Sequence, residues 1–215
     1  MANKLWDKGF KEDERIDAFT VGNDRELDHE LAPYDIMGTM AHITMLESVG
    51  LLSKEDLDKL LPVLKELYSS ACKGELYVEE DVEDIHSQIE LMLTRRLGDV
   101  GKKVHTGRSR NDQVLVDLKL YARAEIENTV HKVESLFNTL QEASERYKDV
   151  LIPGYTHLQV AMPSSFGLWF GAYAESLCDD LSIMKAAWDV VNLNPLGSAA
   201  GYGSSAPLNR TLTTV

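Results

Sequence analysis

Hydrogen-bonding and cationic side chains cluster in one short segment, residues 105–113 (HTGRSRNDQ). Ser109, Arg110 and Asn111 would place hydroxyl, guanidinium and amide donors at the start of a helix, where the positive end of the helix dipole favours anions. Arginine also suits the bidentate capture of a carboxylate or a phosphate. The segment therefore indicates an anion-binding loop. The alternative is a plain helix cap, in which Ser109 or Asn111 caps the helix and the arginines are solvated.

A second polar segment, residues 153–159 (PGYTHLQ), carries a histidine beside a hydroxyl and an amide. Imidazole exchanges protons near neutral pH, so His157 is the candidate acid–base group of the chain. Thr156 and Gln159 are candidate binding groups next to it. A surface or structural role is the alternative, since a single loop histidine more often has one of these roles.

Two Glu-x-x-His pairs offer a different chemistry. Glu26 and His29 form one pair, and Glu83 and His86 form the other, with the spacing that di-iron helical bundles use. Matches of four residues arise by chance in an acidic chain, and Pro33 follows the first pair closely. We therefore expect charged helix faces and no metal, and a di-iron oxidoreductase stays as an alternative.

Helical periodicity runs through most of the chain, and the helices expected in its first half are short. Apolar residues recur at helical spacing over residues 36–46, 57–71 and 82–92, and a glycine soon follows each stretch as an expected helix end. Pro62 lies inside the second stretch and should kink or split that helix. We expect these helices to form one compact helical domain over residues 1–105.

The second half predicts two long helices. No glycine or proline interrupts residues 111–148, and a helix of that length would measure about 57 Å. A second helix should begin with Pro163 in its first turn. Its apolar seam, from Phe170 to Val191, alternates between steps of four and three residues, which suits coiled-coil packing.

The length of these helices has a consequence for assembly. A compact chain of 215 residues has a diameter of about 45 Å, which is less than the length of the first long helix. We therefore expect the long helices to pack against other subunits or against sequence outside this chain. Residues 106–215 would then be the first, incomplete part of a long-helix bundle domain.

Composition argues against several classes of protein. The 35 acidic and 22 basic side chains give a net charge of −13, which does not suit a nucleic-acid partner. The chain contains no apolar segment typical of a signal peptide or a membrane span, and its two distant cysteines suit buried thiols in the cytoplasm. Residues 201–206 fit a dinucleotide-binding pattern but follow no predicted strand, so no nucleotide cofactor is expected. These features predict an all-α cytoplasmic protein that binds a small molecule.

The two polar segments together resemble two signature regions of the argininosuccinate lyases, which belong to the fumarase/aspartase superfamily. HTGRSRNDQV at 105–114 is similar to the first region, and PGYTHLQVAMP at 153–163 is similar to the second. THLQ alone also fits fumarases, whereas its combination with HTGRSRNDQ is far more specific. Shorter matches follow the same order along the chain, at LW (5–6), DIMGT (35–39), EDIH (83–86) and NPLGS (194–198).

The resemblance implies a reversible elimination that splits argininosuccinate into arginine and fumarate, a step of arginine biosynthesis. Proton removal beside a carboxylate creates a dianion that needs fixed donors and cations. By similarity, His157 is the acid–base residue. The resemblance also implies a homotetramer whose active sites each draw on three subunits, and it implies no cofactor. It assigns substrate binding to Asp28, Ser109, Arg110, Asn111, Thr156 and Gln159.

The chain departs from the family pattern in two places. The family's N-terminal segment carries a serine after a phenylalanine, whereas residues 19–24 (FTVGND) contain none. The third signature, GSSxMPxKxN, with its serine base and its lysine, is absent from the 215 residues. We therefore expect an N-terminal fragment that is inactive by itself. A non-catalytic relative with a structural role stays as an alternative, as does elimination from adenylosuccinate or aspartate.

Overall fold

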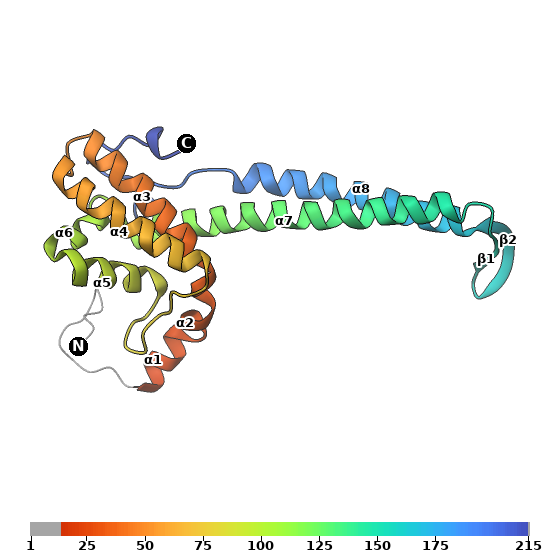
Figure 1. Cartoon of the computed structure of the whole chain (residues 1–215), viewed down its shortest axis with the longest axis horizontal. Coiled ribbons are helices and arrows are strands. Elements are labelled where there is room, and N and C mark those ends of the chain that lie inside the picture. The colour runs from red at the N-terminus through yellow and green to blue at the C-terminus, as the bar shows by residue number, and fades with distance from the viewer. Residues whose placement is uncertain (1–13, 215) are drawn as a thin grey trace. The chain divides into compact units, whose positions relative to one another are not determined.

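The computed structural model describes residues 14–214, and helices make up most of it (Figure 1). The all-α prediction is confirmed, with one small two-stranded sheet in addition. None of the helices in the described part of the chain is long and apolar enough to cross a bilayer. The elements are α1 (Glu14–Val21), α2 (Asp24–Leu27), the 3-10 helix η1 (Asp28–Leu31), α3 (Ala32–Ser48), α4 (Lys54–Cys72), α5 (Ile85–Leu97), α6 (Asp99–Lys102), the 3-10 helix η2 (Lys103–His105), α7 (Arg110–Arg146), β1 (Leu151–Thr156), β2 (Gln159–Ser165), α8 (Phe166–Val191) and the 3-10 helix η3 (Leu212–Thr214).

The chain divides into two compact units, which are described separately. The first comprises Met1–Tyr121 together with Leu193–Val215, and the second comprises Ala122–Asn192. These units do not coincide with the expected domains of residues 1–105 and 106–215, because the start of α7 and the segment after α8 pack with the short helices. The boundary of a complete bundle domain stays a prediction.

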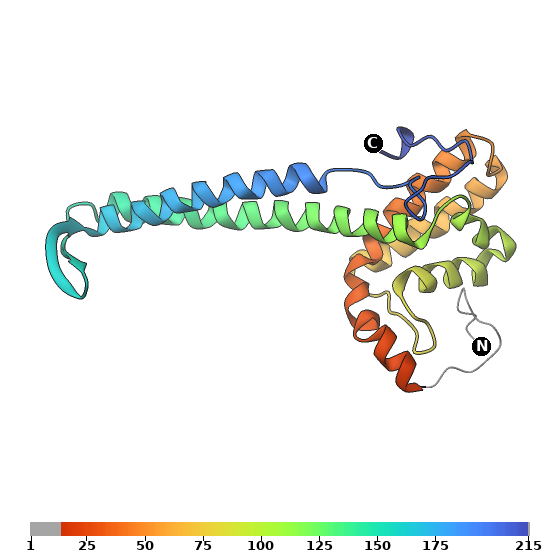
Figure 2. The same ribbon diagram turned by 180° about the vertical axis from the view of Figure 1, so that it is seen from behind.

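The first unit is organised around α3, α4 and α5, and α3 and α4 lie side by side in both views (Figures 1 and 2). Their contact is an aliphatic core, as the periodicity of residues 36–46, 57–71 and 82–92 predicts. Each fully buried aliphatic side chain of this kind contributes about 1.5–3 kcal/mol through removal of apolar surface from water. The core includes Ile36, Ile43, Leu46, Leu60, Leu64, Ile89 and Leu93.

Local sequence explains where the core helices begin. The Ser53 hydroxyl accepts the Asp56 N–H (3.1 Å) at the start of α4, and the Asp84 carboxylate accepts the Ser87 N–H (2.6 Å) at the start of α5. Pro62 does not split α4, which runs through it without a break. Pro62 lies on the exposed face of the helix, where water can bond to the carbonyl that proline leaves unpaired.

In the second unit, α8 runs alongside residues 122–146 of α7, and the β-hairpin follows at their shared end (Figure 2). The Ser144 hydroxyl donates to the Gly167 carbonyl (2.8 Å). At the other end of the pair, the Arg123 guanidinium lies 5.2 Å from the centre of the Trp188 ring. The two long helices predicted from the sequence are therefore present.

The segment expected to be a loop between these helices is an antiparallel hairpin. Thr156 pairs with Gln159 at its tip, and His157 and Leu158 form a two-residue turn with φ values of 50° and 63°. Positive φ at both turn residues matches the right-handed twist of the flanking strands, although side chains other than glycine and asparagine adopt it reluctantly.

The start of α8 corrects a second expectation. Pro163 lies in β2 and not in the first turn of a helix. The helix begins at Phe166, because the Ser165 hydroxyl accepts the Leu168 N–H (3.2 Å) and acts as the N-cap. The serine signal is stronger than the proline signal here.

The second unit has almost no interior of its own. The predicted seam of α8 is its least exposed side, and its Phe170 and Trp188 contact Tyr147 and Arg123 of the same chain. Yet of residues 122–192, all of which the structure describes, only Ser165, Gly167 and Ala174 are buried. Large apolar side chains remain exposed on the hairpin and on α8, among them Leu158, Met162, Trp169, Tyr173 and Ile183.

The two cysteines contradict the expected buried thiols. Cys72 and Cys178 are both free and exposed. Cys72 is the last residue of α4, and Cys178 lies on the outer side of α8, so neither position faces a core.

Candidate functional site

The anion-binding loop predicted from the sequence forms the N-terminal entry to α7. The Ser109 carbonyl accepts the Gln113 N–H (3.2 Å), and the Ser109 hydroxyl accepts the Asn111 N–H (3.3 Å). Asn111 itself is exposed. Ser109 thus has the cap role of the plain alternative and at the same time leaves Asn111 available at the positive end of the helix.

Arg110 is fixed by neighbours and is not a solvated cation. Its guanidinium donates to the Gln113 side-chain oxygen (2.9 Å) and to the Ser87 hydroxyl (3.3 Å), and it lies 3.9 Å from the Asp84 carboxylate. These partners orient the fork toward the start of α5. The structure therefore excludes the interpretation of Arg110 as a freely solvated side chain.

Asp28 lies at the same end of α5. Its carboxylate accepts the Ile85 N–H (3.3 Å), and burial raises the pKa of Asp28 above its usual value. The start of α5 thus brings Asp28 and Arg110, two of the predicted substrate-binding residues, to one helix terminus. Ser87, which the sequence did not single out, and Asp84, which belongs to the EDIH stretch, connect Arg110 to this terminus.

His157, Thr156 and Gln159 lie in the second unit, at the tip of the hairpin. All three are exposed, and the tight turn brings Thr156 and Gln159 next to each other across the strand pair. The sequence thus correctly places the three polar side chains in one small surface feature, although that feature is a hairpin and not a loop. Because the hairpin belongs to the second unit and residues 109–111 belong to the first, each group is described by itself.

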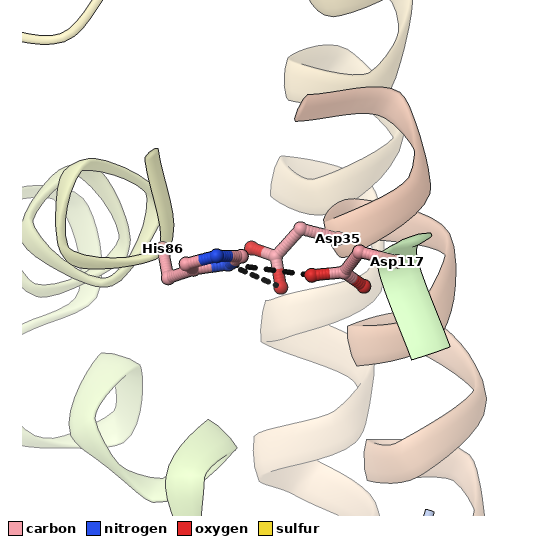
Figure 3. A group of neighbouring side chains, drawn as sticks. All are labelled: Asp35, His86 and Asp117. Carbon is pink, nitrogen blue, oxygen red and sulfur yellow. Dashed lines mark ion pairs between the residues drawn. The ribbon is translucent and has the colours of Figure 1, made fainter. Parts of the chain in front are cut away.

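A buried polar cluster is the main feature that sequence reasoning missed. Asp35 on α3, His86 on α5 and Asp117 on α7 meet in the first unit, and each is less than 5% exposed (Figure 3). The His86 Nδ1 atom lies 3.4 Å from the Asp35 Oδ1 atom and 3.3 Å from the Asp117 Oδ2 atom. The imidazole edge therefore faces both carboxyl groups at once.

The two carboxyl groups differ in their tendency to ionise. Burial raises the pKa of Asp117 well above its usual value, and the neighbouring Asp35 carboxylate adds to that rise. Burial acts in the same direction on Asp35, but His86, Arg108 and Gln113 outweigh it and lower the pKa of Asp35 to about 2. The Gln113 amide donates to Asp35 at 2.5 Å. Burial and the neighbouring charge thus favour the protonated form of Asp117 and the ionised form of Asp35.

The cluster is also the place where the described residues could hold a metal ion, since its three ligand atoms all lie within 4.8 Å of one another. Arg108 argues against that use, because its buried guanidinium supplies positive charge beside both carboxyl groups. Donation to the Thr39 hydroxyl (3.0 Å) holds this guanidinium in place. The buried arginine thus offsets negative charge that a divalent cation would otherwise have to balance.

The two Glu-x-x-His pairs do not converge on a di-iron site within the described residues. His86 takes part in the buried cluster, but Glu83 does not. His29 contacts the Glu26 carbonyl of its own turn and lies 3.0 Å from the Glu30 carboxylate. The alternative of a di-iron oxidoreductase therefore has no structural support.

Part of this cluster carried a sequence signal. Asp35 and His86 belong to the DIMGT and EDIH stretches that support the family resemblance. Asp117 had no such signal. Asp117 is buried on α7 together with Asp112 and Gln113, so polar residues interrupt the apolar face of this helix. Such an interruption is the sequence pattern that could have revealed Asp117.

Comparisons with known proteins agree on one family. A family model described as "Lyase" matches residues 8–213. A protein of Parabacteroides distasonis named "Argininosuccinate lyase" is 66% identical over 214 residues, which is 100% of this chain and 48% of that protein. One of Thermotoga neapolitana with the same name is 38% identical over 213 residues, covering 99% of this chain and 54% of its own length.

A solved structure supports the same fold. The structure of an EDDS lyase variant with bound fumarate matches with a TM-score of 0.76 and 27% identity, over 96% of this chain and 41% of that one. The chain thus spans about half the length of the curated relatives it matches.

Proposed function

The chain belongs to the lyase family whose model spans residues 8–213, and from this premise we propose that the complete protein is an argininosuccinate lyase. The reaction would split argininosuccinate reversibly into arginine and fumarate. The observation that carries the proposal is the identity of 66% with an argininosuccinate lyase over the whole chain. A non-catalytic role or a different elimination substrate has no comparable support.

The first unit would bind the succinyl end of the substrate. Asn111 is exposed at the positive terminus of α7, and Arg110 is oriented by fixed partners, so both suit a carboxylate. Fixed donors of this kind stabilise the dianion that forms when a proton leaves the carbon beside the carboxylate. Asp28 would bind a cationic or hydroxyl-bearing part of the substrate from the neighbouring helix terminus.

The second unit would supply the acid–base group. His157 lies at the exposed hairpin tip, and Thr156 and Gln159 flank it with a hydroxyl and an amide. In the complete protein, His157 would exchange a proton with the reacting substrate, while Thr156 and Gln159 would hold the substrate in place. The exposed side chains of this hairpin support a role that is completed by other chain segments.

We also propose a homotetramer that acts in the cytoplasm. In the second unit, Leu158, Trp169 and Ile183 are 97%, 48% and 73% exposed, respectively. Such exposure of several large apolar side chains is typical of an interaction surface. Copies of the same helices would cover these surfaces and would bring hairpins to the anion loops of neighbouring subunits.

The proposal is tested by assaying fumarate release at about 240 nm for the complete encoded polypeptide and for the 215-residue chain. We expect activity from the complete polypeptide and none from the 215-residue chain, because the serine and lysine of the third signature are absent from it. A complete polypeptide that does not act on argininosuccinate contradicts the proposed function. A 215-residue chain that turns over contradicts only the need for the missing loop.

His157→Asn tests the assigned acid–base role in the complete polypeptide. Loss of a general acid–base group lowers kcat by about 10²–10⁴-fold, and we expect the KM for argininosuccinate to change little. His131→Asn is the matched control, because His131 is exposed on α7 and belongs to neither predicted site. A kcat of the His157 variant close to that of the wild type removes His157 from the acid–base role.

A further inference from the structure

Asp112 connects the substrate loop to a segment that lies much later in the chain. Its carboxylate is fully buried and accepts three backbone N–H groups. Oδ1 accepts the Ser109 N–H at 2.9 Å, and Oδ2 accepts the Gly197 N–H at 3.1 Å and the Ala199 N–H at 2.9 Å. Ser109 and the turn at residues 196–199 are therefore separated by only one carboxylate group and its hydrogen bonds.

The 196–199 turn is held in a specific conformation. Gly197 has a φ of 89° and Ala199 a φ of 50°, and the second of these is costly for a residue with a Cβ atom. On the opposite side of the turn, Arg210 donates from Nε to the Leu196 carbonyl (3.0 Å). Asp112 thus binds the N–H groups of the turn while Arg210 binds a carbonyl, so the turn is fixed from two sides.

The same turn leaves donors for an anion. Within the described part of the chain, the Ser198 hydroxyl and the Ala200 N–H make no hydrogen bond, and Ala200 is exposed. The side chains from Gly197 to Ala200 are small, so a ligand can approach the backbone closely. These donors belong to a turn that Asp112 ties directly to Ser109, next to Asn111.

We propose that Asp112 is a positioning residue for the substrate site, and that the 196–199 turn, with Ala200, forms part of the surface that binds the succinyl carboxylates. This inference rests on the proposed function and adds a second chain segment to its anion site. Asp112 does not touch the substrate. It keeps Ser109 and Asn111 in register with the turn, so that donors from both segments reach the same carboxylate.

The test uses Asp112→Asn in the complete polypeptide. Asparagine has one side-chain oxygen, so it cannot accept hydrogen bonds at both ends, and its NH₂ group would face N–H donors. We expect kcat/KM for argininosuccinate to fall by about 10–100-fold, chiefly through a higher KM, because small misplacements of binding groups are costly. In the same variant, hydrogen exchange at the Gly197 and Ala199 amides should become faster.

Gly197→Ala disturbs the same turn without touching Asp112. A Cβ atom at this position would lie 2.8 Å from the Arg210 Cγ atom, and the alanine would have to adopt a φ of 89°. We expect the same rise in KM. Gly74→Ala is the matched control, because it places a Cβ atom on a residue with a positive φ of 70° where no atom lies within 4 Å of that Cβ. Position 74 is far along the chain from both segments. Leu64→Ala controls for a loss of core stability alone.

The outcomes separate the two proposals. If the Asp112 and Gly197 variants keep a wild-type KM, or raise it no more than the Gly74 and Leu64 controls do, the positioning role is overturned. If the wild-type polypeptide itself does not act on argininosuccinate, the proposed function fails and the positioning role fails with it. The amide exchange of Gly197 and Ala199 then still decides whether Asp112 holds the turn.

Discussion

Three side chains from three helices, Asp35, His86 and Asp117, lie together in the interior of the first unit, where an unpaired charge is costly. Their neighbour Arg108 is buried as well, and it contributes a positive charge that favours ionised Asp35. The lowest-cost arrangement keeps Asp117 protonated, because a second carboxylate beside the first would be an unpaired buried charge. The cluster therefore makes the stability of the first unit depend on pH.

Asp117→Asn should reduce this dependence. The folded chain retains a proton on Asp117 that the unfolded chain releases above about pH 4, so the Asp117 contribution to stability falls as pH rises toward the raised pKa. The slope is at most about 1.4 kcal/mol per pH unit for one proton. Asparagine keeps a neutral side chain of the same shape, so the variant should gain stability relative to wild type at pH 8 and less at pH 5.

The measurement is urea unfolding of the 215-residue chain and its variant at both pH values. Burial lowers the pKa of His42 and of His105 to about 4, but both histidines titrate alike in the two proteins, so the difference between the proteins isolates Asp117. Asp99→Asn is the control. Lys102 lowers the pKa of the Asp99 carboxyl, whose titration therefore lies below this pH range. An equal pH dependence in wild type and the Asp117 variant would show that the site is ionised.

At the scale of elements, the sequence predicts most helices because their signals are local. Apolar spacing and the glycines after each helix act within one or two turns, and the structure confirms α3, α4, α5, α7 and α8. The hairpin was missed because its strands lack a clean apolar alternation and contain proline. The start of α8 was misplaced because Pro163 and Ser165 are both start signals, and only the contacts of the folded chain decide between them.

The candidate site was predictable only in part, for a related reason. Ser109, Arg110 and Asn111 are neighbours in the sequence, so their joint position at the start of a helix follows from local pattern. Asp117 meets Asp35 and His86 only after three helices pack together, and Asp112 meets the 196–199 turn only after the chain returns to the first unit. Long-range partners of this kind leave no local signal.

Gly167→Ala tests how closely α8 must approach α7. A Cβ atom at position 167 would lie 2.6 Å from the Lys148 Cα atom and 2.9 Å from the Ser144 carbonyl oxygen, so the backbone would have to move. We expect a loss of about 1–3 kcal/mol in the free energy of unfolding. The Ser144 hydrogen bond to the Gly167 carbonyl should weaken as well.

Gly171→Ala is the matched control, one turn further along α8. Its Cβ atom would meet only the Ser144 hydroxyl, at 3.5 Å, and replacing a helical glycine by alanine adds about 0.5–1 kcal/mol of stability. Urea unfolding of both variants measures the difference. Equal stability of the two variants would mean that α7 and α8 can separate here at no cost.

At the scale of the whole molecule, the second unit has too small an interior to bury its apolar side chains. Its buried residues are Ser165, Gly167 and Ala174. None of the three has a large apolar side chain to bury. An isolated pair of long helices gains stability mainly when its apolar faces pack against further helices. The proposed homotetramer would provide that packing, and the exposed side of α8 is the surface to perturb.

Ile183→Lys should weaken the assembly of the complete polypeptide. Ile183 is 73% exposed on α8, so a lysine there is harmless to a single chain but places a charge in a helix-to-helix interface. We expect a tetramer for the wild type and smaller species for the variant, measured as molar mass by light scattering. Tyr77→Lys is the control, because Tyr77 is 71% exposed in the first unit, between α4 and α5, and should leave the mass unchanged. A monomeric wild type, or a tetramer that tolerates lysine at position 183, would show that the exposed side of α8 meets water and not another subunit.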